Sequence, residues 1–143
     1  HRAHARREGE WRDVTVVVTH LESSAKDSAA RKVQTALMLD ALRDYAKKTP
    51  VILGGDLNAT PDEEMFAAVR AAGLSVGTRQ KVGEDGKVAV LENHIDYVLA
   101  RGLSVVRDRT SPRVVPAVYP PGPDGQMLGD HAIVTAKIDL PWL

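Results

Sequence analysis

The sequence contains no cysteine, which excludes disulfide bridges and metal sites built on thiolates. Aromatic residues make up only 4% of the chain, too few for an extensive surface on which nucleic-acid bases could stack. Neither sign of charge predominates, because Lys plus Arg and Asp plus Glu both number 19. The molecule as a whole therefore has no net field that attracts polyanions or anionic membranes, and any such affinity must come from a local patch.

Long apolar runs are also absent, and segments such as 16–18 are far too short to cross a bilayer. The first residues contain no apolar core of a signal peptide. We therefore expect a soluble chain and assign it no compartment. The 143 residues are 43% hydrophobic and 27% charged, which is typical of one globular domain. Because the chain starts at His1 and not at Met, we expect it to be part of a longer polypeptide.

Apolar spacing predicts a strand and then a helix at the start of the chain. The β-branched run 14–19 is typical of a strand buried on both faces of a sheet, and it ends at His20. Apolar residues then recur at helical spacing over 30–45, after the capping candidates Asp27 and Ser28. This alternation of β and α elements favours an α/β fold.

A second strand and helix repeat this order. The apolar run 51–53 predicts a short buried strand that stops at two glycines and places Asp56 and Asn58 at a strand end. Strand ends are where α/β sheets build their sites. Residues 60–63, Thr-Pro-Asp-Glu, form a capping box with Pro at the first helical position, so we expect a helix that Gly73 ends.

The second half of the chain is predicted to be mostly β. The strand-forming segments are 81–82, 88–91, 95–99, 103–106 and 132–138. Asp85-Gly86 suits a hairpin turn between the first two segments. Prolines gather in 112–123, which predicts a long, partly stiffened loop of the kind that often carries function.

Four short polar segments stand at predicted strand ends. They are Thr19-His20-Leu21, Gly55-Asp56-Leu57-Asn58, Ile95-Asp96-Tyr97-Val98 and Gly129-Asp130-His131. Taken singly, each segment is more often ordinary turn chemistry or a satisfied polar residue than a functional site. Their occurrence together, in one order, is a far more specific signal.

In that order the segments resemble the endonuclease/exonuclease/phosphatase superfamily, which includes deoxyribonuclease I, abasic-site endonucleases, bacterial sphingomyelinases and inositol polyphosphate 5-phosphatases. The likeness covers 14–138, and its most specific part is 51–58, which is similar to the family's strand followed by Gly-Asp-x-Asn. The helix that carries Arg31 and Gln34 also fits. The resemblance implies that residues 1–143 are the C-terminal portion of one deoxyribonuclease I-like domain, part of a two-sheet β-sandwich flanked by helices.

The resemblance also implies an activity, namely metal-dependent hydrolysis of phosphate esters by an activated water. Asp56 would orient or activate the water, and Asn58 would hold the phosphate or orient Asp56 without adding negative charge. Asp96 would orient His131 and favour its cationic form, so that His131 stabilises the transition state. His20 would donate to another phosphate oxygen.

The implied cofactor is Mg²⁺ or Mn²⁺, carried by Asp130 and Asp56 directly or through ordered waters. Two departures from the family pattern affect this expectation. Members commonly have Ser where this chain has Gly129. The family's N-terminal half supplies an Asn and the principal metal-binding Glu, and nothing in this sequence matches them. The implied partner of the chain is therefore that missing half, whose absence would leave one sheet face bare and prone to association.

Two other interpretations stay open from the sequence. The first is a catalytically degenerate interaction module of the same fold, suggested by Gly129 and the missing Glu. The second is an unrelated α/β protein that binds metal or phosphate, in which Asp56 and Asp130 are only turn residues. The substrate class, whether nucleic acid, phospholipid or phosphosugar, is not set by these residues. The basic residues of 101–113 suit either a polyanion patch or ordinary solvated surface.

Overall fold

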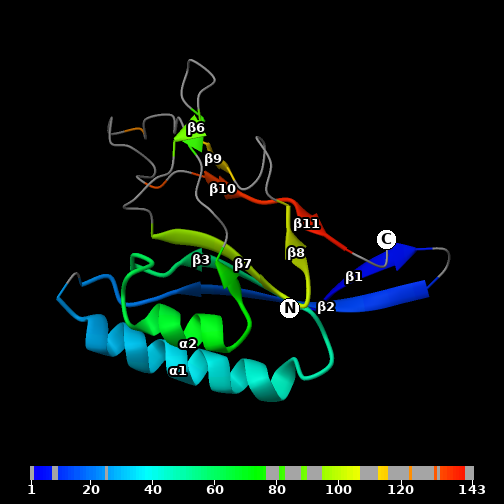
Figure 1. The fold of residues 1–143 in the computed structure, drawn as a ribbon, viewed down its shortest axis with the longest axis horizontal. Coiled ribbons are helices and arrows are strands. Elements are labelled where there is room, and N and C mark those ends of the chain that lie inside the picture. Colours follow the sequence, from blue (N-terminus) through cyan, green and yellow to red (C-terminus); the bar gives the residue numbers. More distant parts are fainter. Residues whose placement is uncertain are drawn as a thin grey trace.

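A mixed five-stranded sheet forms the middle layer of the molecule, in the order β1-β2-β3-β7-β4 (Figure 1). The structure is a computed structural model, and it describes residues 2–7, 10–24, 26–76, 81–82, 88–89, 95–106, 113–115, 123, 131 and 133–140. The strands of this sheet are β1 (Arg2–Arg7), β2 (Glu10–His20), β3 (Val51–Asp56), β7 (Asp96–Arg101) and β4 (Ser75–Val76). β2 and β3 run parallel, whereas the other neighbours are antiparallel.

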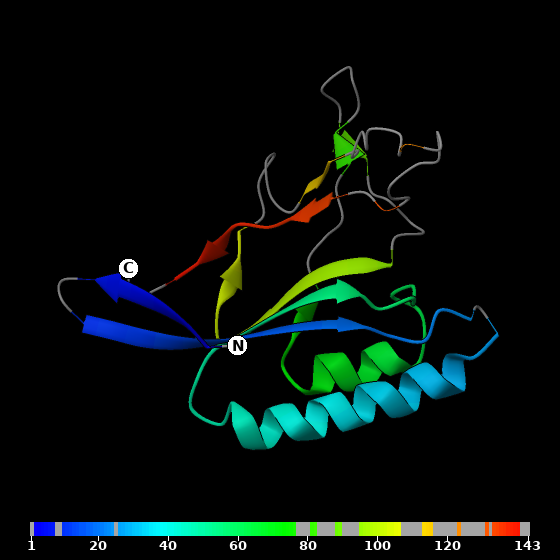
Figure 2. The ribbon, with the colours of Figure 1, turned by 180° about the vertical axis from the view of Figure 1, so that it is seen from behind.

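Two helices cover one face of this sheet, α1 (Ser28–Tyr45) and α2 (Met65–Ala71), as Figures 1 and 2 show from opposite sides. The predicted start of α1 is confirmed, because the carboxylate of Asp27 accepts a hydrogen bond of 2.9 Å from the backbone N–H of Ala30. Among the described residues, no helix combines the length and the apolar character needed to cross a membrane.

The predicted start of α2 is wrong, since the helix begins at Met65 and no capping box forms. The carboxylate of Glu63, which the box would need, is instead bonded to Arg31 of α1. The predicted end is confirmed: Gly73 has φ +75°, and its N–H donates to the carbonyl of Arg70 at 2.9 Å. Leu74 N–H reaches back to the carbonyl of Val69 at 3.2 Å, so the helix ends in a Schellman motif.

Smaller β elements lie over the other face of the main sheet (Figure 1). A four-stranded sheet has the order β10-β9-β5-β6, and β11 pairs with β8. Their bounds are β5 (Lys81–Val82), β6 (Val88–Ala89), β8 (Ser104–Val105), β9 (Arg113–Val115), β10 (Ile133–Thr135) and β11 (Ile138–Asp139). β5 and β6 are antiparallel, as a hairpin requires, but the predicted turn at Asp85-Gly86 lies outside the described residues.

The prediction of one final strand over 132–138 is wrong. Its first part, β10, pairs with β9, and its last part joins β11, which pairs with β8. The chain changes partner between them, where the carbonyl of Lys137 accepts a hydrogen bond of 2.9 Å from the backbone N–H of Val106. The segment therefore divides between two sheets.

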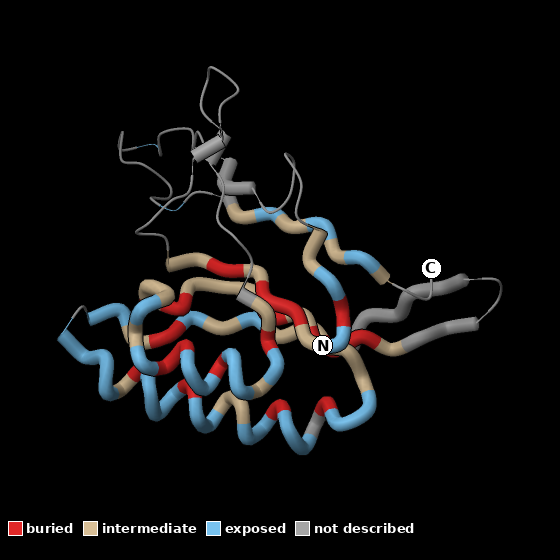
Figure 3. The backbone as a smooth tube through the Cα atoms, viewed as in Figure 1, coloured by how far each residue is buried: buried red, intermediate tan, exposed pale blue. Residues whose placement is uncertain are grey.

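The main core lies between the sheet and the helices, where Figure 3 shows buried residues along the facing sides of both. Its largest fully buried side chains include Leu53, Phe66 and Leu99. Tyr97 packs against Phe66 with ring centroids 5.0 Å apart, and its hydroxyl donates to the carbonyl of Ala59 at 2.7 Å. This packing fixes β3 and β7 side by side, and those two strands carry site residues.

The opposite face of the sheet is only partly covered. At one end Val14, Ala100 and Leu103 form a small core with residues of β8 and β11. Toward the other end the side chain of Val18 is 80% exposed. The expectation that the strand over 14–19 is buried on both faces is therefore wrong, because β2 is packed against the helices on one face and open at Val18 on the other.

Candidate active site

Polar residues end three neighbouring strands of the main sheet at the same edge. His20 and Asp56 are register partners at the carboxyl ends of β2 and β3, and Asp56 is also the partner of Asp96 at the start of β7. Side chains of register partners project from the same face of a sheet. The three side chains therefore gather on one face, and His20 Nε2 lies 3.6 Å from Asp56 Oδ2.

Gly55 makes the close approach of these strands possible. Its φ of +136° is a backbone conformation that L side chains rarely adopt. A Cβ atom at this position would lie 1.9 Å from the carbonyl oxygen of Thr19. The glycine directly before Asp56 is therefore required by packing against β2, and it places Asp56 beside His20.

Asp56 and Asn58 form a compact turn at the end of β3. The side chain of Asp56 is 11% exposed, and its Oδ1 accepts a hydrogen bond of 2.7 Å from the backbone N–H of Asn58. Asn58 has φ +48°, a left-handed conformation that asparagine tolerates better than most residues. Its side-chain Nδ2 donates to the carbonyl of Leu21 at 2.9 Å. Asn58 thus orients Asp56 through its backbone and ties the turn to the segment after His20 through its side chain.

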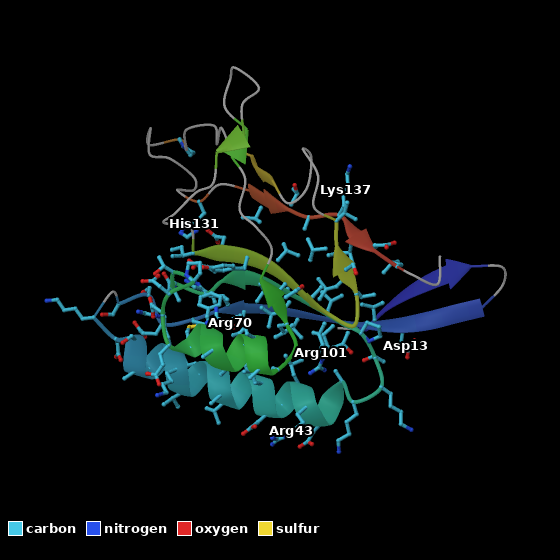
Figure 4. The ribbon with its side chains drawn as sticks, in the orientation of Figure 1. Asp13, Arg43, Arg70, Arg101, His131 and Lys137 are labelled. Carbon is cyan, nitrogen blue, oxygen red and sulfur yellow. The ribbon has the colours of Figure 1, made fainter. Side chains whose placement is uncertain are left out.

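His131 comes from a different part of the fold, the segment just before β10. Figure 4 shows it above the start of β7, on the face opposite the helices. Its Nδ1 is 3.0 Å from Asp96 Oδ2, and its Nε2 is 3.7 Å from Asp56 Oδ2. The ring is 44% exposed. One imidazole therefore spans the two carboxylates while part of it faces solvent.

Asp56, Asp96 and His131 each offer one possible ligand atom, and these atoms lie within 4.8 Å of one another. Carboxylate oxygens suit Mg²⁺ and Mn²⁺, so the donor set fits part of the coordination shell of such an ion. The sequence indicated Asp130 and Asp56 as metal ligands, and Asp130 lies outside the described residues together with Gly129. The structure adds Asp96 and His131 to the set of possible ligands.

The proximity of Asp96 to Asp56 follows from the pairing of their strands. Both residues stand at ends of short apolar strands, and antiparallel pairing of those strands brings their ends together. Of the basic residues in 101–113, Arg101 donates to the carbonyl of Ala46 on the helix side of the sheet at 3.2 Å. Arg107 and Arg109 lie outside the described residues.

The sequence also matches a known family model. The model is that of the Endonuclease/Exonuclease/phosphatase family, and the match covers residues 1–131. The chain belongs to this family. The resemblance seen in the four polar segments is thereby confirmed. No curated protein matches the chain.

Several solved structures share the fold. Humanized TDP2 of D. rerio superposes with a TM-score of 0.63 at 19% identity, covering 97% of this chain and 57% of that one. A mannosyl-6-phosphatase of Bacteroides thetaiotaomicron gives 0.62 at 18% identity, covering 93% and 53%. A protein of unknown function from Enterococcus faecalis gives 0.61 at 20% identity, covering 92% and 51%.

These structural similarities show the fold of this chain. It is a mixed α/β, deoxyribonuclease I-like fold, as the sequence predicted, with part of a two-sheet sandwich and helices outside it. The chain spans 51–57% of the length of these three structures.

Proposed function

We propose that the domain containing this chain hydrolyses phosphate esters with a water molecule activated at Asp56 and a divalent cation as cofactor. The observation that carries the proposal is the register of three strand ends, which lines up His20, Asp56 and Asp96 while His131 spans the two carboxylates. Membership of the Endonuclease/Exonuclease/phosphatase family supports the same reaction class.

The proposed mechanism assigns the proton transfer to Asp56. Its Oδ1 is oriented by the N–H of Asn58, which leaves Oδ2, on the side of the two imidazoles, to accept a proton from the attacking water. A carboxylate held by a backbone donor needs no reorientation as the reaction proceeds. This preorganisation lowers the barrier because the base is already in its reactive position.

The two histidines are proposed to bind the phosphoryl group. When Nδ1 of His131 carries a proton, it donates to Asp96. This hydrogen bond directs Nε2 of the same ring toward the reacting oxygens. A protonated Nε2 then stabilises negative charge that develops on a phosphate oxygen. His20, which is mostly exposed beside Asp56, is proposed to donate to another phosphate oxygen. Together they offset the repulsion between two carboxylates and an anionic substrate.

The proposed metal ligands are Asp56 and Asp130, with Asp96 as a further candidate, because an imidazole of His131 that donates from both ring nitrogens has no lone pair left for a metal. A bound Mg²⁺ or Mn²⁺ would neutralise charge on the phosphate. The donors in the described residues fill only part of such a shell, so ligands from elsewhere in the domain are part of the proposal.

The remaining part of the domain is the proposed partner of this chain. The chain spans about half the length of the solved structures it matches, and Val18 on its open sheet face is 80% exposed. An apolar depression lined by Val17, Met38, Ala41 and Leu42 lies beside the same strand, between β2 and α1. Apolar surface of this kind is stabilised by packing against further elements.

The proposed substrates are phosphate esters, from the classes of nucleic acids, phospholipids or phosphosugars. One matched structure is D. rerio TDP2 complexed with a single-stranded DNA product, and another is a mannosyl-6-phosphatase. The same fold therefore occurs in a protein that binds a single-stranded DNA product and in a mannosyl-6-phosphatase. Substrate choice depends on loops outside the strand ends that hold the four site residues.

The test is a Mg²⁺-dependent hydrolysis screen of the complete protein against those three substrate classes, followed by Asp56→Ala and His131→Ala. Both substitutions are expected to abolish most turnover, whereas Asp40→Ala, which removes an exposed carboxylate of α1 paired with Arg43, leaves turnover unchanged. Undiminished turnover in both site variants contradicts the proposal. A folded wild-type protein without activity on any class supports the interaction-module alternative instead.

A further inference from the structure

A buried arginine contacts the segments that follow His20 and Asn58 in the chain. Arg31, the fourth residue of α1, is 2% exposed. Its Nη1 donates to the carbonyl oxygens of Ser24 at 2.6 Å and Glu22 at 3.3 Å. Its Nε and Nη2 donate to the carboxylate of Glu63 at 3.1–3.2 Å. One guanidinium therefore makes five contacts with three other residues.

These contacts join the two loops that follow β2 and β3. The segment 21–24 follows His20 at the end of β2, and the turn that contains Glu63 follows Asn58 at the end of β3. Two further bonds connect the same loops nearer the site. Leu21 N–H donates to the carbonyl of Asp56 at 3.0 Å, and Asn58 Nδ2 donates to the carbonyl of Leu21 at 2.9 Å.

We infer that Arg31 is a positioning residue, which holds the loop after His20 against the loop after Asn58 and so keeps both residues beside Asp56. This inference rests on the proposed function for its catalytic meaning, but the positioning itself is a property of the fold. Among the described residues, Arg31 makes no hydrogen bond to a site side chain. Its effect passes through the carbonyls of Glu22 and Ser24 on one side and the carboxylate of Glu63 on the other.

The geometry requires a guanidinium and not simply a positive charge. Arg31 uses donors on Nε, Nη1 and Nη2, which point to acceptors on different segments. A lysine ammonium is a compact charge on a flexible stem and cannot reproduce this fixed fork. Gln34, one turn further along α1, accepts from the N–H of Glu22 at 2.9 Å. Residues near the start of α1 thus form hydrogen bonds both to the carbonyl oxygens and to a backbone N–H of the loop after His20.

The neighbouring ion pair offers a matched control. Lys32 and Glu64 follow Arg31 and Glu63 by one residue each, and they join the same two elements at 2.6 Å. Their side chains are 58% and 76% exposed, however, and Lys32 contacts no loop carbonyl in any hydrogen bond that the structure gives for it. Exposed pairs of this type contribute little to structure or stability. Substitution of Lys32 therefore removes an equivalent charge but leaves the hydrogen bonds of Arg31 to the two loops in place.

The experiment compares Arg31→Lys, Arg31→Met and Lys32→Met in the complete protein, with the side-chain amide resonance of Asn58 and the imidazole resonances of His20 as probes. Both Arg31 variants are expected to shift or broaden these resonances, and Lys32→Met leaves them in place. With the best phosphate ester as substrate, kcat is expected to fall about 10- to 100-fold in Arg31→Lys while KM changes little.

Two results would overturn the inference. The first is unchanged Asn58 and His20 resonances in a folded Arg31 variant. The second is a variant whose melting temperature falls but whose kcat, measured well below melting, equals that of the wild type, because this describes a structural pair only. If Arg31→Met does not fold, Glu63→Gln is judged by the same two criteria. The resonances need no turnover, so a failure of the proposed hydrolysis is distinguishable from a failure of the positioning role.

Discussion

His20 and Asp56 are register partners on two parallel strands, and their side chains meet at 3.6 Å although 36 positions separate them in the sequence. Parallel strands bring their carboxyl ends to the same edge of the sheet. A polar residue at the end of each strand is therefore enough to place two site residues side by side. The antiparallel strand β7 completes the row with Asp96. Its chain direction is opposite, so its contribution comes from its first residue and not its last.

Asp56→Asn is expected to reduce kcat by at least about 100-fold, because the amide cannot accept a proton from water. The fold is expected to be retained, since the side-chain oxygen of Asn can still accept the hydrogen bond from the backbone N–H of Asn58. Steady-state rates and thermal melting of the complete protein check both parts. An activity within twofold of the wild type, in a protein with normal melting, contradicts the role of Asp56.

Asp96→Asn and His131→Ala are expected to act as one unit. Asp96 orients the imidazole through the 3.0 Å contact to Nδ1, so loss of either residue removes the same function. The double variant is therefore expected to lose no more activity than the worse single variant, within about threefold. Losses that multiply would show that the two residues work independently.

Gly55→Ala is expected to destabilise the domain by at least about 2 kcal/mol, since the added Cβ meets the backbone of Thr19 and φ is +136°. The matched control is Gly54→Ala, whose Cβ would come no closer than 3.7 Å to any neighbour. Its expected change in the free energy of unfolding is under about 1 kcal/mol. Chemical denaturation measures both values, and equal effects at the two glycines would argue against the close approach of β2 and β3.

The isolated chain is expected to self-associate through its open sheet face, and Val18→Thr is expected to reduce this association. Val18 is 80% exposed, so the substitution costs little stability while it makes the face more polar. Val33→Thr is the control, because Val33 is also apolar and exposed but lies on α1. Light scattering during gel filtration measures the mass. Equal masses for wild type and Val18→Thr at all concentrations would contradict the prediction.

Mn²⁺ is expected to bind at the row of carboxylates, where Asp56, Asp96 and His131 offer ligand atoms within 4.8 Å of one another. This paramagnetic ion should broaden the backbone resonances of these residues before those of exposed acidic residues such as Asp40 and Asp44. EDTA should restore them. Broadening confined to α1 would place the ion elsewhere. Asp56→Ala should weaken the Mn²⁺-induced broadening, because it removes one of the two carboxylates of this group.

Much of this arrangement was predictable, because local signals decided it. The capping carboxylate of Asp27 and the glycine at 73 mark helix ends through short-range hydrogen bonds and backbone conformation. Strand ends were indicated by the glycines and polar residues that follow short apolar runs. The family resemblance then related these ends to one another, which periodicity alone does not do.

The errors of prediction came from tertiary contacts that override local patterns. Residues 60–63 have the sequence of a capping box, but Glu63 pairs with a buried Arg31 that lies 32 residues away, and the helix starts later. The segment 132–138 has continuous strand propensity, yet its partners are two short strands in different sheets. Neither contact leaves a trace in the local sequence, so the structure was needed to find them.

His131 belongs to the layer of β10, whereas the carboxylates that it spans belong to the middle sheet. The site therefore bridges two layers, and under the proposed function the spacing between those layers affects catalysis. Changes in distant side chains that separate or compress the layers will alter the distances from this imidazole to Asp96 and Asp56. Variants of the interlayer packing are thus expected to tune turnover without touching any residue that contacts phosphate.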